Sequence, residues 1–174
     1  MQGYFKEPGK TAETLTLDGS LRTGDKGEQD EEGNLRLTGR IKEIFKTSKG
    51  KFVAPAPIEN RMAVDTRLEQ ICVVGEGMVQ PLAICVLSEA GRSAANGEGR
   101  IELESALRAL LEQINGELDK HEQLRGIVLV KDVWAVENGY LTPTLKIKRA
   151  VIESSYGKHF DDWLQRCDAV LWQE

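Results

Sequence analysis

Residues 37–51 read LTGRIKEIFKTSKGK, and the rest of the chain is organised around this stretch. Before it lies a short segment rich in acidic residues and glycine, and after it comes a pattern of strands and helices long enough for a domain. Its five cations surround two glycines, which suits a backbone that moves near phosphates, although a solvated surface is the commoner explanation of such a run. The stretch predicts a domain boundary, and a second basic segment, residues 141–149, predicts a strand far downstream.

The composition is that of an ordinary globular protein. Of the 174 residues, 40% are hydrophobic and 29% are charged, and the net charge is -5. A protein that neutralises many phosphates is normally basic, so general binding of nucleic acid is disfavoured, whereas a nucleotide site needs only a local basic patch. No secretory signal and no membrane-spanning run is visible. Cys72, Cys85 and Cys167 show no metal spacing, which predicts free thiols in a reducing cytoplasm.

Residues 1–40 contain turn signals and little that could form a core. The pattern from residue 17 to residue 40 predicts a strand, a turn near residues 32–34 and a second strand. Two short strands bury too little apolar surface to be stable alone. We therefore interpret residues 1–40 as the end of a larger N-terminal domain. The acidic run at residues 28–32 is interpreted as a solvated turn, because its spacing fits no calcium loop.

Residues 41–174 carry the periodicities of a domain with both strands and helices. The predicted helices are residues 58–64, 101–118 and 158–172, and the predicted strands are residues 68–74, 82–87 and 125–134. This pattern predicts an α+β fold with a small mixed sheet covered by helices. No phosphate loop ending in GK[ST] is present. His121 and His159 are isolated from each other and from the cysteines, so neither is assigned a metal or catalytic role.

Three separated stretches, in this order, resemble one family. They read LRTGDKGEQDEEGNLRLTGR (residues 21–40), IKEIFKTSKGKFVAPAPIEN (residues 41–60) and NGYLTPTLKIKR (residues 138–149). The family is that of the adenylate-forming, AMP-binding acyl-CoA synthetases, and within it the bacterial long-chain fatty-acid ligases. The resemblance covers nearly the whole chain but only the C-terminal part of such an enzyme. It implies that the phosphate loop, the adenine pocket and the acyl tunnel belong to a large N-terminal domain outside this sequence.

The resemblance assigns two residues to the nucleotide. Asp25 matches the acidic residue that holds the ribose hydroxyls of ATP, a role that suits a carboxylate because it accepts two hydrogen bonds. Arg40 matches an arginine that contacts the same nucleotide through its fork of donors. Without the resemblance, a turn aspartate and a surface arginine are the simpler interpretations.

Two further residues are assigned to movement and to the thiol channel. Lys42 matches the hinge position, where backbone torsions change as the C-terminal domain turns between two working orientations. Gly50 resembles the glycine beside the pantetheine channel of CoA, within a one-residue ambiguity of alignment, and a simple turn glycine is the alternative.

Lys146 matches the single catalytic lysine of the family. The resemblance implies that this cation holds the substrate carboxylate and the α-phosphate as the two anions meet. From the local residues alone, a lysine that protects an edge strand is the more frequent explanation. Lys148 and Arg149 are interpreted as supporting cations that touch the phosphates of CoA.

The implied activity is a ligase reaction with ATP, Mg²⁺, CoA and a fatty acid, carried out in the cytoplasm by this chain together with its N-terminal domain. No residue of this chain is assigned to a metal, and the chain alone is expected to be inactive, because substrate orientation belongs to the other domain. Two alternatives stay open: an interaction module that keeps the fold without the chemistry, and an adenylating domain that loads a carrier protein.

Overall fold

The computed structural model describes residues 1–97, 99–166 and 168–173, and the chain forms two compact units, Met1–Glu43 and Ile44–Glu174. The sequence placed a division between residues 40 and 41. The assignment of the first segment to the end of a larger domain stays a prediction.

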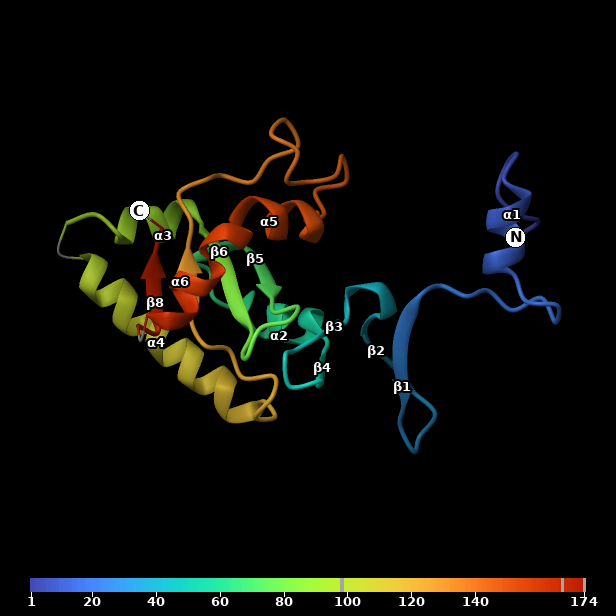
Figure 1. The fold of residues 1–174 in the computed structure, drawn as a ribbon, viewed down its shortest axis with the longest axis horizontal. Coiled ribbons are helices and arrows are strands. Elements are labelled where there is room, and N and C mark those ends of the chain that lie inside the picture. The colour runs from blue at the N-terminus through green and yellow to red at the C-terminus, as the bar shows by residue number, and fades with distance from the viewer. Residues whose placement is uncertain (98, 167, 174) are drawn as a thin grey trace. The chain divides into compact units, whose positions relative to one another are not determined.

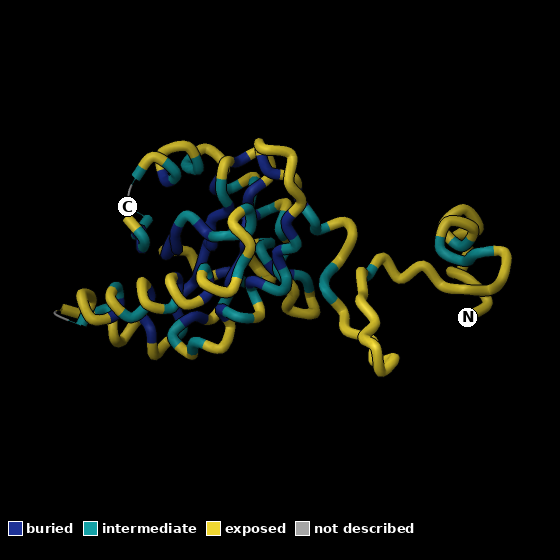
Figure 2. Tube along the Cα trace, turned by 90° about the horizontal axis from the view of Figure 1, so that it is seen from below, coloured by how far each residue is buried: buried dark blue, intermediate teal, exposed yellow. Residues whose placement is uncertain are grey.

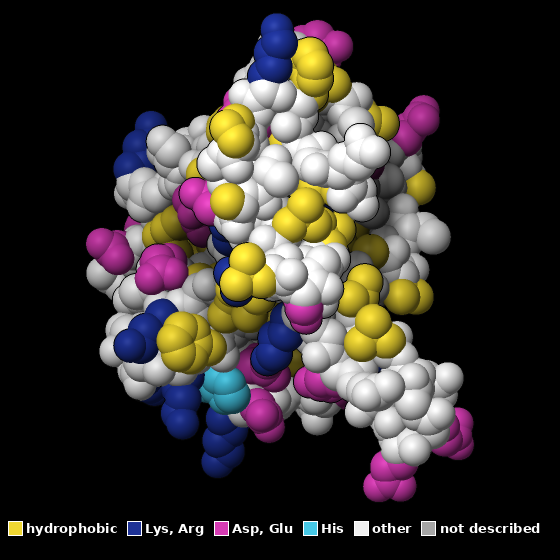
Figure 3. Space-filling model, turned by 90° about the vertical axis from the view of Figure 1, so that its right-hand side faces the viewer, with side chains coloured by type: hydrophobic (Ala, Val, Ile, Leu, Met, Phe, Trp, Pro, Cys, Tyr) yellow, Lys and Arg dark blue, Asp and Glu magenta, His cyan; other side chains and the backbone are white. Residues whose placement is uncertain are grey.

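The first unit is a hairpin preceded by a short helix. It contains α1 (Pro8–Thr14), β1 (Asp25–Gln29), β2 (Leu35–Arg40) and the 3-10 helix η1 (Ile41–Glu43), and β1 pairs with β2 antiparallel. The strand–turn–strand prediction is confirmed. Leu35 and Leu37 are 71% and 67% exposed, and no residue of this unit is fully buried. Figure 3 looks onto the N-terminal end of the chain, where apolar side chains lie exposed among charged ones.

The second unit is built on a four-stranded mixed sheet. The strands β5 (Leu68–Val74), β6 (Leu82–Leu87), β7 (Ile127–Leu129) and β8 (Val170–Trp172) lie in that order. The β5–β6 pair is antiparallel, and the β6–β7 and β7–β8 pairs are parallel. Every residue of β6 is buried, as expected for a central strand covered on both faces. The predicted α+β fold class is confirmed.

Helices cover both faces of this sheet (Figure 1). One apolar core joins one face of the sheet to α2 (Pro55–Met62) and α4 (Gly99–Glu117), and the other joins the opposite face to α5 (Arg149–Tyr156) and α6 (Phe160–Gln165). Figure 2 shows the buried residues concentrated in this unit. The remaining elements are α3 (Glu89–Ala94), the 3-10 helix η2 (Gly157–His159) and the two-residue strands β3 (Phe45–Lys46) and β4 (Phe52–Val53).

The prediction for residues 158–172 was wrong in its second half. The helical segment ends at Gln165, and Leu171 lies in β8, with its side chain in the core on the α5 and α6 face of the sheet. A short apolar run satisfies helical and strand spacing equally, and pairing with β7 decides for the strand. Cys167, placed by the sequence on the same helical face, lies outside the described residues. The predicted strand at residues 125–134 is limited to Ile127–Leu129.

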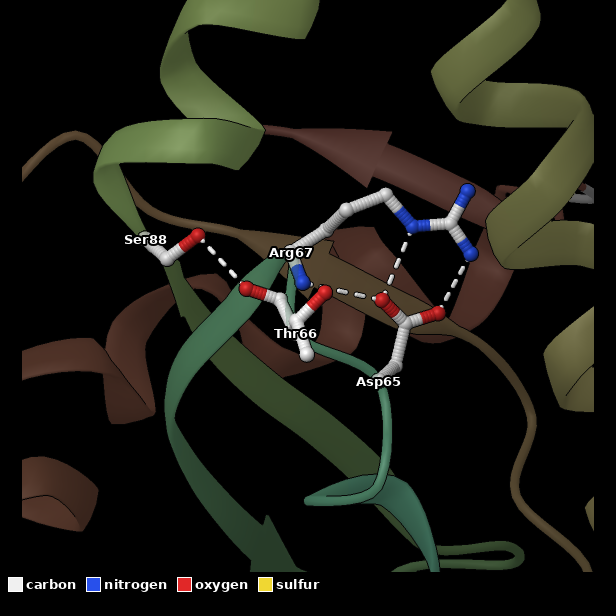
Figure 4. Close-up of polar contacts among 4 residues, drawn as sticks. All are labelled: Asp65, Thr66, Arg67 and Ser88. Atoms are coloured by element: carbon white, nitrogen blue, oxygen red, sulfur yellow. Dashed lines mark hydrogen bonds and ion pairs between the residues drawn. The ribbon is translucent and has the colours of Figure 1, made fainter.

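A tight corner joins the start of β5 to the start of α3 (Figure 4). The Asp65 carboxylate accepts hydrogen bonds from Nε and the backbone N–H of Arg67, at 2.8 and 3.0 Å, and these hydrogen bonds hold the pKa of Asp65 below its usual value. The Ser88 hydroxyl donates to the Thr66 carbonyl at 2.8 Å and accepts from the Gly91 N–H, which caps α3. The corner leaves no space at Gly91, where a Cβ would lie 2.3 Å from the Arg67 carbonyl oxygen.

We expect Gly91→Ala to lower the free energy of unfolding by about 2 kcal/mol, because the backbone of the corner must move to admit the methyl group. The matched control is Gly116→Ala in α4, where the added Cβ meets no atom within 4 Å apart from its chain neighbours and the helix's own backbone. That change is expected to raise the free energy of unfolding by about 0.5–1 kcal/mol, because alanine favours helix over glycine. Urea denaturation followed by tryptophan fluorescence measures both. Equal effects of the two changes would contradict the steric explanation.

Candidate functional site

The two predicted nucleotide-binding residues, Asp25 and Arg40, lie side by side. They are cross-strand partners at the open end of the β1–β2 hairpin, and Nε of Arg40 lies 3.2 Å from Oδ1 of Asp25. The Arg40 side chain is 58% exposed, so the ion pair is worth little in water and is easily exchanged for other partners. The structure thus brings together a carboxylate and a guanidinium at an accessible surface, which is the donor and acceptor set a ribose and a phosphate require.

Lys42, the predicted hinge residue, is the central residue of η1 and lies next to the division between the two units. No residue of η1 is buried, so few packed contacts oppose a torsional change there. The hinge role itself stays a prediction.

Gly50, the predicted neighbour of the CoA channel, lies in the turn that joins β3 to β4. Its φ of 77° is in the left-handed region that glycine favours, and its N–H donates to the Thr47 carbonyl at 2.9 Å. Thr47 is 4% exposed, and its hydroxyl closes the turn through two hydrogen bonds with the backbone of Lys51. A turn requirement therefore accounts for Gly50, and its role beside CoA stays a prediction.

Lys146 lies in a turn that is closed by hydrogen bonds to Thr142, and the prediction that it lies on an extended strand was wrong. The Thr142 hydroxyl accepts from the Lys146 N–H at 3.0 Å, and the Thr142 N–H donates to the Lys146 carbonyl at 2.8 Å. A single bridge between Leu141 and Ile147 closes the base, and α5 begins at Arg149. Pro143 within the segment is incompatible with a continuous ladder. The exposed ammonium group of Lys146 is thereby held on an ordered backbone rather than a loose loop.

The residue before Lys146 is strained. Leu145 has φ of 60°, a left-handed conformation that is uncommon for a bulky residue, and its side chain is 72% exposed. Backbone strain of this kind is found where the surrounding contacts hold a functional residue in place.

We expect Leu145→Gly to raise the free energy of unfolding by about 1 kcal/mol, because glycine adopts the left-handed conformation without the steric penalty. Leu145→Ala removes the same exposed side chain and keeps the penalty, so this control is expected to give no gain. Chemical denaturation of the two variants in parallel makes the measurement. A gain in the alanine variant equal to that in the glycine variant would show that the side chain, not the backbone, is responsible.

The two cations after Lys146 have different surroundings. Lys148 is exposed and immediately precedes α5. Arg149 points inward: its guanidinium lies 2.8 Å from Oε1 of Glu59 on α2 and donates to the Val73 carbonyl on β5. The Glu59 carboxylate also accepts from the Val73 N–H at 2.7 Å. These contacts give Arg149 an internal structural role, and its predicted contact with CoA stays a prediction.

An aromatic cluster supports the base of the Lys146 turn. The Tyr140 ring stacks against Trp134 and Tyr156 with centroids 6.2 Å apart in each case, and the Tyr140 carbonyl accepts from the Lys148 N–H at 2.9 Å. The Tyr156 hydroxyl donates to Asp132 at 2.8 Å and accepts from the Trp134 indole at 3.2 Å, and burial strongly raises the pKa of this hydroxyl. Sequence reasoning missed these residues, since only the tertiary fold brings them together.

The described residues contain no group of three or more His, Cys, Asp or Glu side chains able to hold a metal ion. In the described part of the chain, no helix has the length and apolar character needed to cross a membrane.

Residues 42–167 match the family model of the AMP-binding enzyme C-terminal domain, over most of the chain. The chain belongs to this family. Long-chain-fatty-acid–CoA ligase 1 of Cavia porcellus is 35% identical over 92% of this chain, and long-chain-fatty-acid–CoA ligase FadD15 of Mycobacterium tuberculosis (strain ATCC 25618 / H37Rv) is 30% identical over 91%. The chain spans 25% and 28% of the length of these two relatives. The family resemblance seen in the sequence is confirmed.

Solved structures agree with the AMP-binding enzyme C-terminal domain fold. The adenylation domain of a carboxylate reductase from Mycobacterium chelonae superposes with a TM-score of 0.78 at 25% identity, covering 94% of this chain and 26% of that one. The adenylation domain of the carboxylic acid reductase from Segniliparus rugosus, solved with AMP and a co-purified carboxylic acid, gives 0.75 at 29% identity, with the same two coverages. Both are adenylate-forming enzymes much longer than this AMP-binding enzyme C-terminal domain.

Proposed function

We propose that this chain is the C-terminal portion of an ATP-dependent long-chain fatty acid–CoA ligase. The reaction has two steps: a carboxylate and ATP form an acyl-adenylate and pyrophosphate, and the acyl group then passes to the thiol of CoA. The observation that carries the proposal is the similarity to long-chain fatty-acid–CoA ligases over 92% of the chain, which includes the Lys146 turn. The substrates are a fatty acid, ATP and CoA, and the main partner is the N-terminal part of the same enzyme.

Lys146 is the catalytic residue of the first step in this proposal. A carboxylate must approach an α-phosphate, and negative charge grows at phosphorus as pyrophosphate leaves. A cation placed between these anions lowers the barrier because it favours the transition state over the separated reactants. A lysine on a flexible stem also arrives and departs with a turning domain. The hydrogen bonds of the Lys146 turn fix the backbone of this residue, so only its side chain has to be ordered when the substrates are bound.

The other site residues divide between the nucleotide, the hinge and CoA. We assign the Asp25 and Arg40 pair to the ribose and phosphates of ATP, Lys42 to the torsional change between the two steps, and Gly50 and Lys148 to the approach of CoA. Mg²⁺ neutralises phosphate charge when it is bound, and we assign no residue of this chain to it. The buried thiols Cys72 and Cys85 support a location in the reducing cytoplasm.

A second candidate is adenylation coupled to a carrier protein. The neighbour from Segniliparus rugosus was also solved as a didomain of the adenylation domain with a PCP domain in complex with AMP, and it superposes with a TM-score of 0.75 at 29% identity. In such a protein the acyl acceptor is a tethered thiol rather than free CoA.

The identity of the acceptor tests the proposal. The full-length enzyme, given ATP, Mg²⁺ and a long-chain fatty acid, is expected to acylate free CoA and not a phosphopantetheine-bearing carrier protein, and the 174-residue chain alone is expected to acylate neither. Mass spectrometry of the thioester products makes the measurement. Acylation of the carrier protein alone would favour the second candidate. Failure to acylate either acceptor would favour an interaction module without chemistry.

A further inference from the structure

A small pocket of about 290 Å³ lies where α4 meets β8. Its charged and aromatic lining residues are Arg100, Glu104, Arg108, Arg166, Asp168 and Trp172. The pocket is remote from the Lys146 turn within the same unit: β8 is the edge strand opposite β5, and α4 packs on the face opposite α5. Neither the proposed ligase reaction nor the family resemblance uses these residues.

The side chains of Arg100, Glu104 and Trp172 hold one another in place and form one wall of the pocket. Nε of Arg100 donates to Glu104 at 3.0 Å, and its guanidinium carbon lies 4.4 Å from the centroid of the Trp172 ring. The indole N–H of Trp172 donates to the same Glu104 oxygen at 2.6 Å. The charge of Glu104 is therefore satisfied within the wall, and the indole is fixed in orientation.

Two further arginines, Arg108 and Arg166, line the pocket, and nearby carboxylates neutralise their positive charge only weakly. Arg108 follows Glu104 by one turn on the same stripe of α4 and is exposed. The Arg166 carbonyl accepts from the Arg125 guanidinium at 2.7 Å, which anchors its backbone, whereas its own Nε lies 3.8 Å from Asp168 in a loose pair. Among the ion pairs of the described residues, an anion that binds Arg166 in the pocket displaces this loose contact with Asp168. The charges that face the pocket sum to one net positive charge when Glu104 and Asp168 are included.

We propose that this pocket binds a phosphate group, held between the forks of Arg108 and Arg166. Two guanidinium groups match the oxygens of a phosphate in bidentate geometry. The volume lies just below the range of about 300–1,000 Å³ typical of small-molecule sites, which favours a compact phosphate monoester or inorganic phosphate over a nucleotide. The site is independent of the proposed ligase activity and belongs to this chain alone.

Titration of the ¹⁵N-labelled 174-residue chain at constant ionic strength tests the site. Inorganic phosphate is the first probe, phosphoserine tests for a monoester, and acetate tests for a carboxylate, with the Trp172 indole N–H signal as the readout. We expect saturable binding of phosphate or phosphoserine and none of acetate. Preference for phosphoserine identifies a monoester as the ligand, and preference for inorganic phosphate identifies the free ion.

Variants that remove a positive or a negative charge distinguish a specific phosphate site from nonspecific electrostatic attraction of the anion to the protein. Arg108→Gln and Arg166→Gln are each expected to raise the Kd about tenfold, because each removes a charge-assisted contact. Asp168→Asn is expected to lower the Kd about threefold, because it removes the competing carboxylate. The matched controls are Arg61→Gln on α2 and Asp161→Asn on α6, which change the net charge equally outside the pocket. Lack of saturation, or equal shifts in the controls, overturns the proposal.

Discussion

The variant Lys146→Ala in the full-length enzyme, under the proposed ligase function, is expected to form acyl-adenylate about 10²–10³-fold more slowly, a loss typical of removing one stabilising contact to transition-state charge. Acyl transfer from preformed adenylate to CoA is expected to survive, because in that step the thiol attacks the acyl carbonyl carbon and AMP leaves, so no carboxylate has to be brought to the α-phosphate. The exposed position of Lys146 predicts a stability change within about 0.5 kcal/mol, so the loss is chemical rather than structural.

The two half-reactions are measured separately, by pyrophosphate release and by thioester formation. Lys131→Ala is the control, since Lys131 is an exposed lysine of the same unit with no assigned role. Retention of both half-reactions in Lys146→Ala would make Lys146 a surface lysine. Loss of both would show that the residue serves more than the first step.

Arg149→Met is expected to lower the free energy of unfolding of the 174-residue chain by about 2–3 kcal/mol. The change leaves the Glu59 carboxylate and the Val73 carbonyl without their shared cation, and both Glu59 and Arg149 side chains are less than one-fifth exposed, at 18% and 17%. Breaking one half of a buried pair is costly because the remaining charge stays desolvated. The expected loss of stability is smaller than for a fully buried ion pair, because both side chains keep some contact with water.

Lys148→Met is the adjacent control and is expected to change the free energy of unfolding by less than about 0.5 kcal/mol, because Lys148 is exposed. Urea denaturation of both variants, followed by the fluorescence of tryptophans that all lie in the second unit, makes the comparison. Equal stability of the two variants would mean that the Arg149 contacts with Glu59 and Val73 contribute little to the stability of the fold.

The sheet and its long helix were predictable because their apolar patterns are local. The runs at residues 68–74 and 82–87 are strands, and the stripe that contains Leu103, Leu107 and Leu111 forms α4. The role of Lys146 was assigned from the family motifs, but no local sequence pattern predicted the turn in which it lies. A left-handed residue is usually signalled by glycine, and here the position is occupied by Leu145.

Long-range pairing explains what the sequence could not show. Arg149 and Glu59 are 90 residues apart, so a cation that the sequence predicted at the phosphates of CoA is turned inward by a partner that no local pattern identifies. The helix prediction for the end of the chain was wrong for the same reason, since Leu171 joins a sheet whose other strands lie far upstream. The Asp25 and Arg40 pair was found by family motif, and their contact follows from the hairpin register.

The position of β8 has a consequence for synthesis on the ribosome. Ile127 pairs with Val170, so β7 emerges from the exit tunnel about 40 residues before its neighbour. At typical elongation rates this leaves an uncovered apolar strand edge for about 2–8 s. Such an edge is a template for aggregation. We therefore expect a nascent chain stalled after α6 to aggregate more readily than a chain that has added β8, because β8 covers this edge.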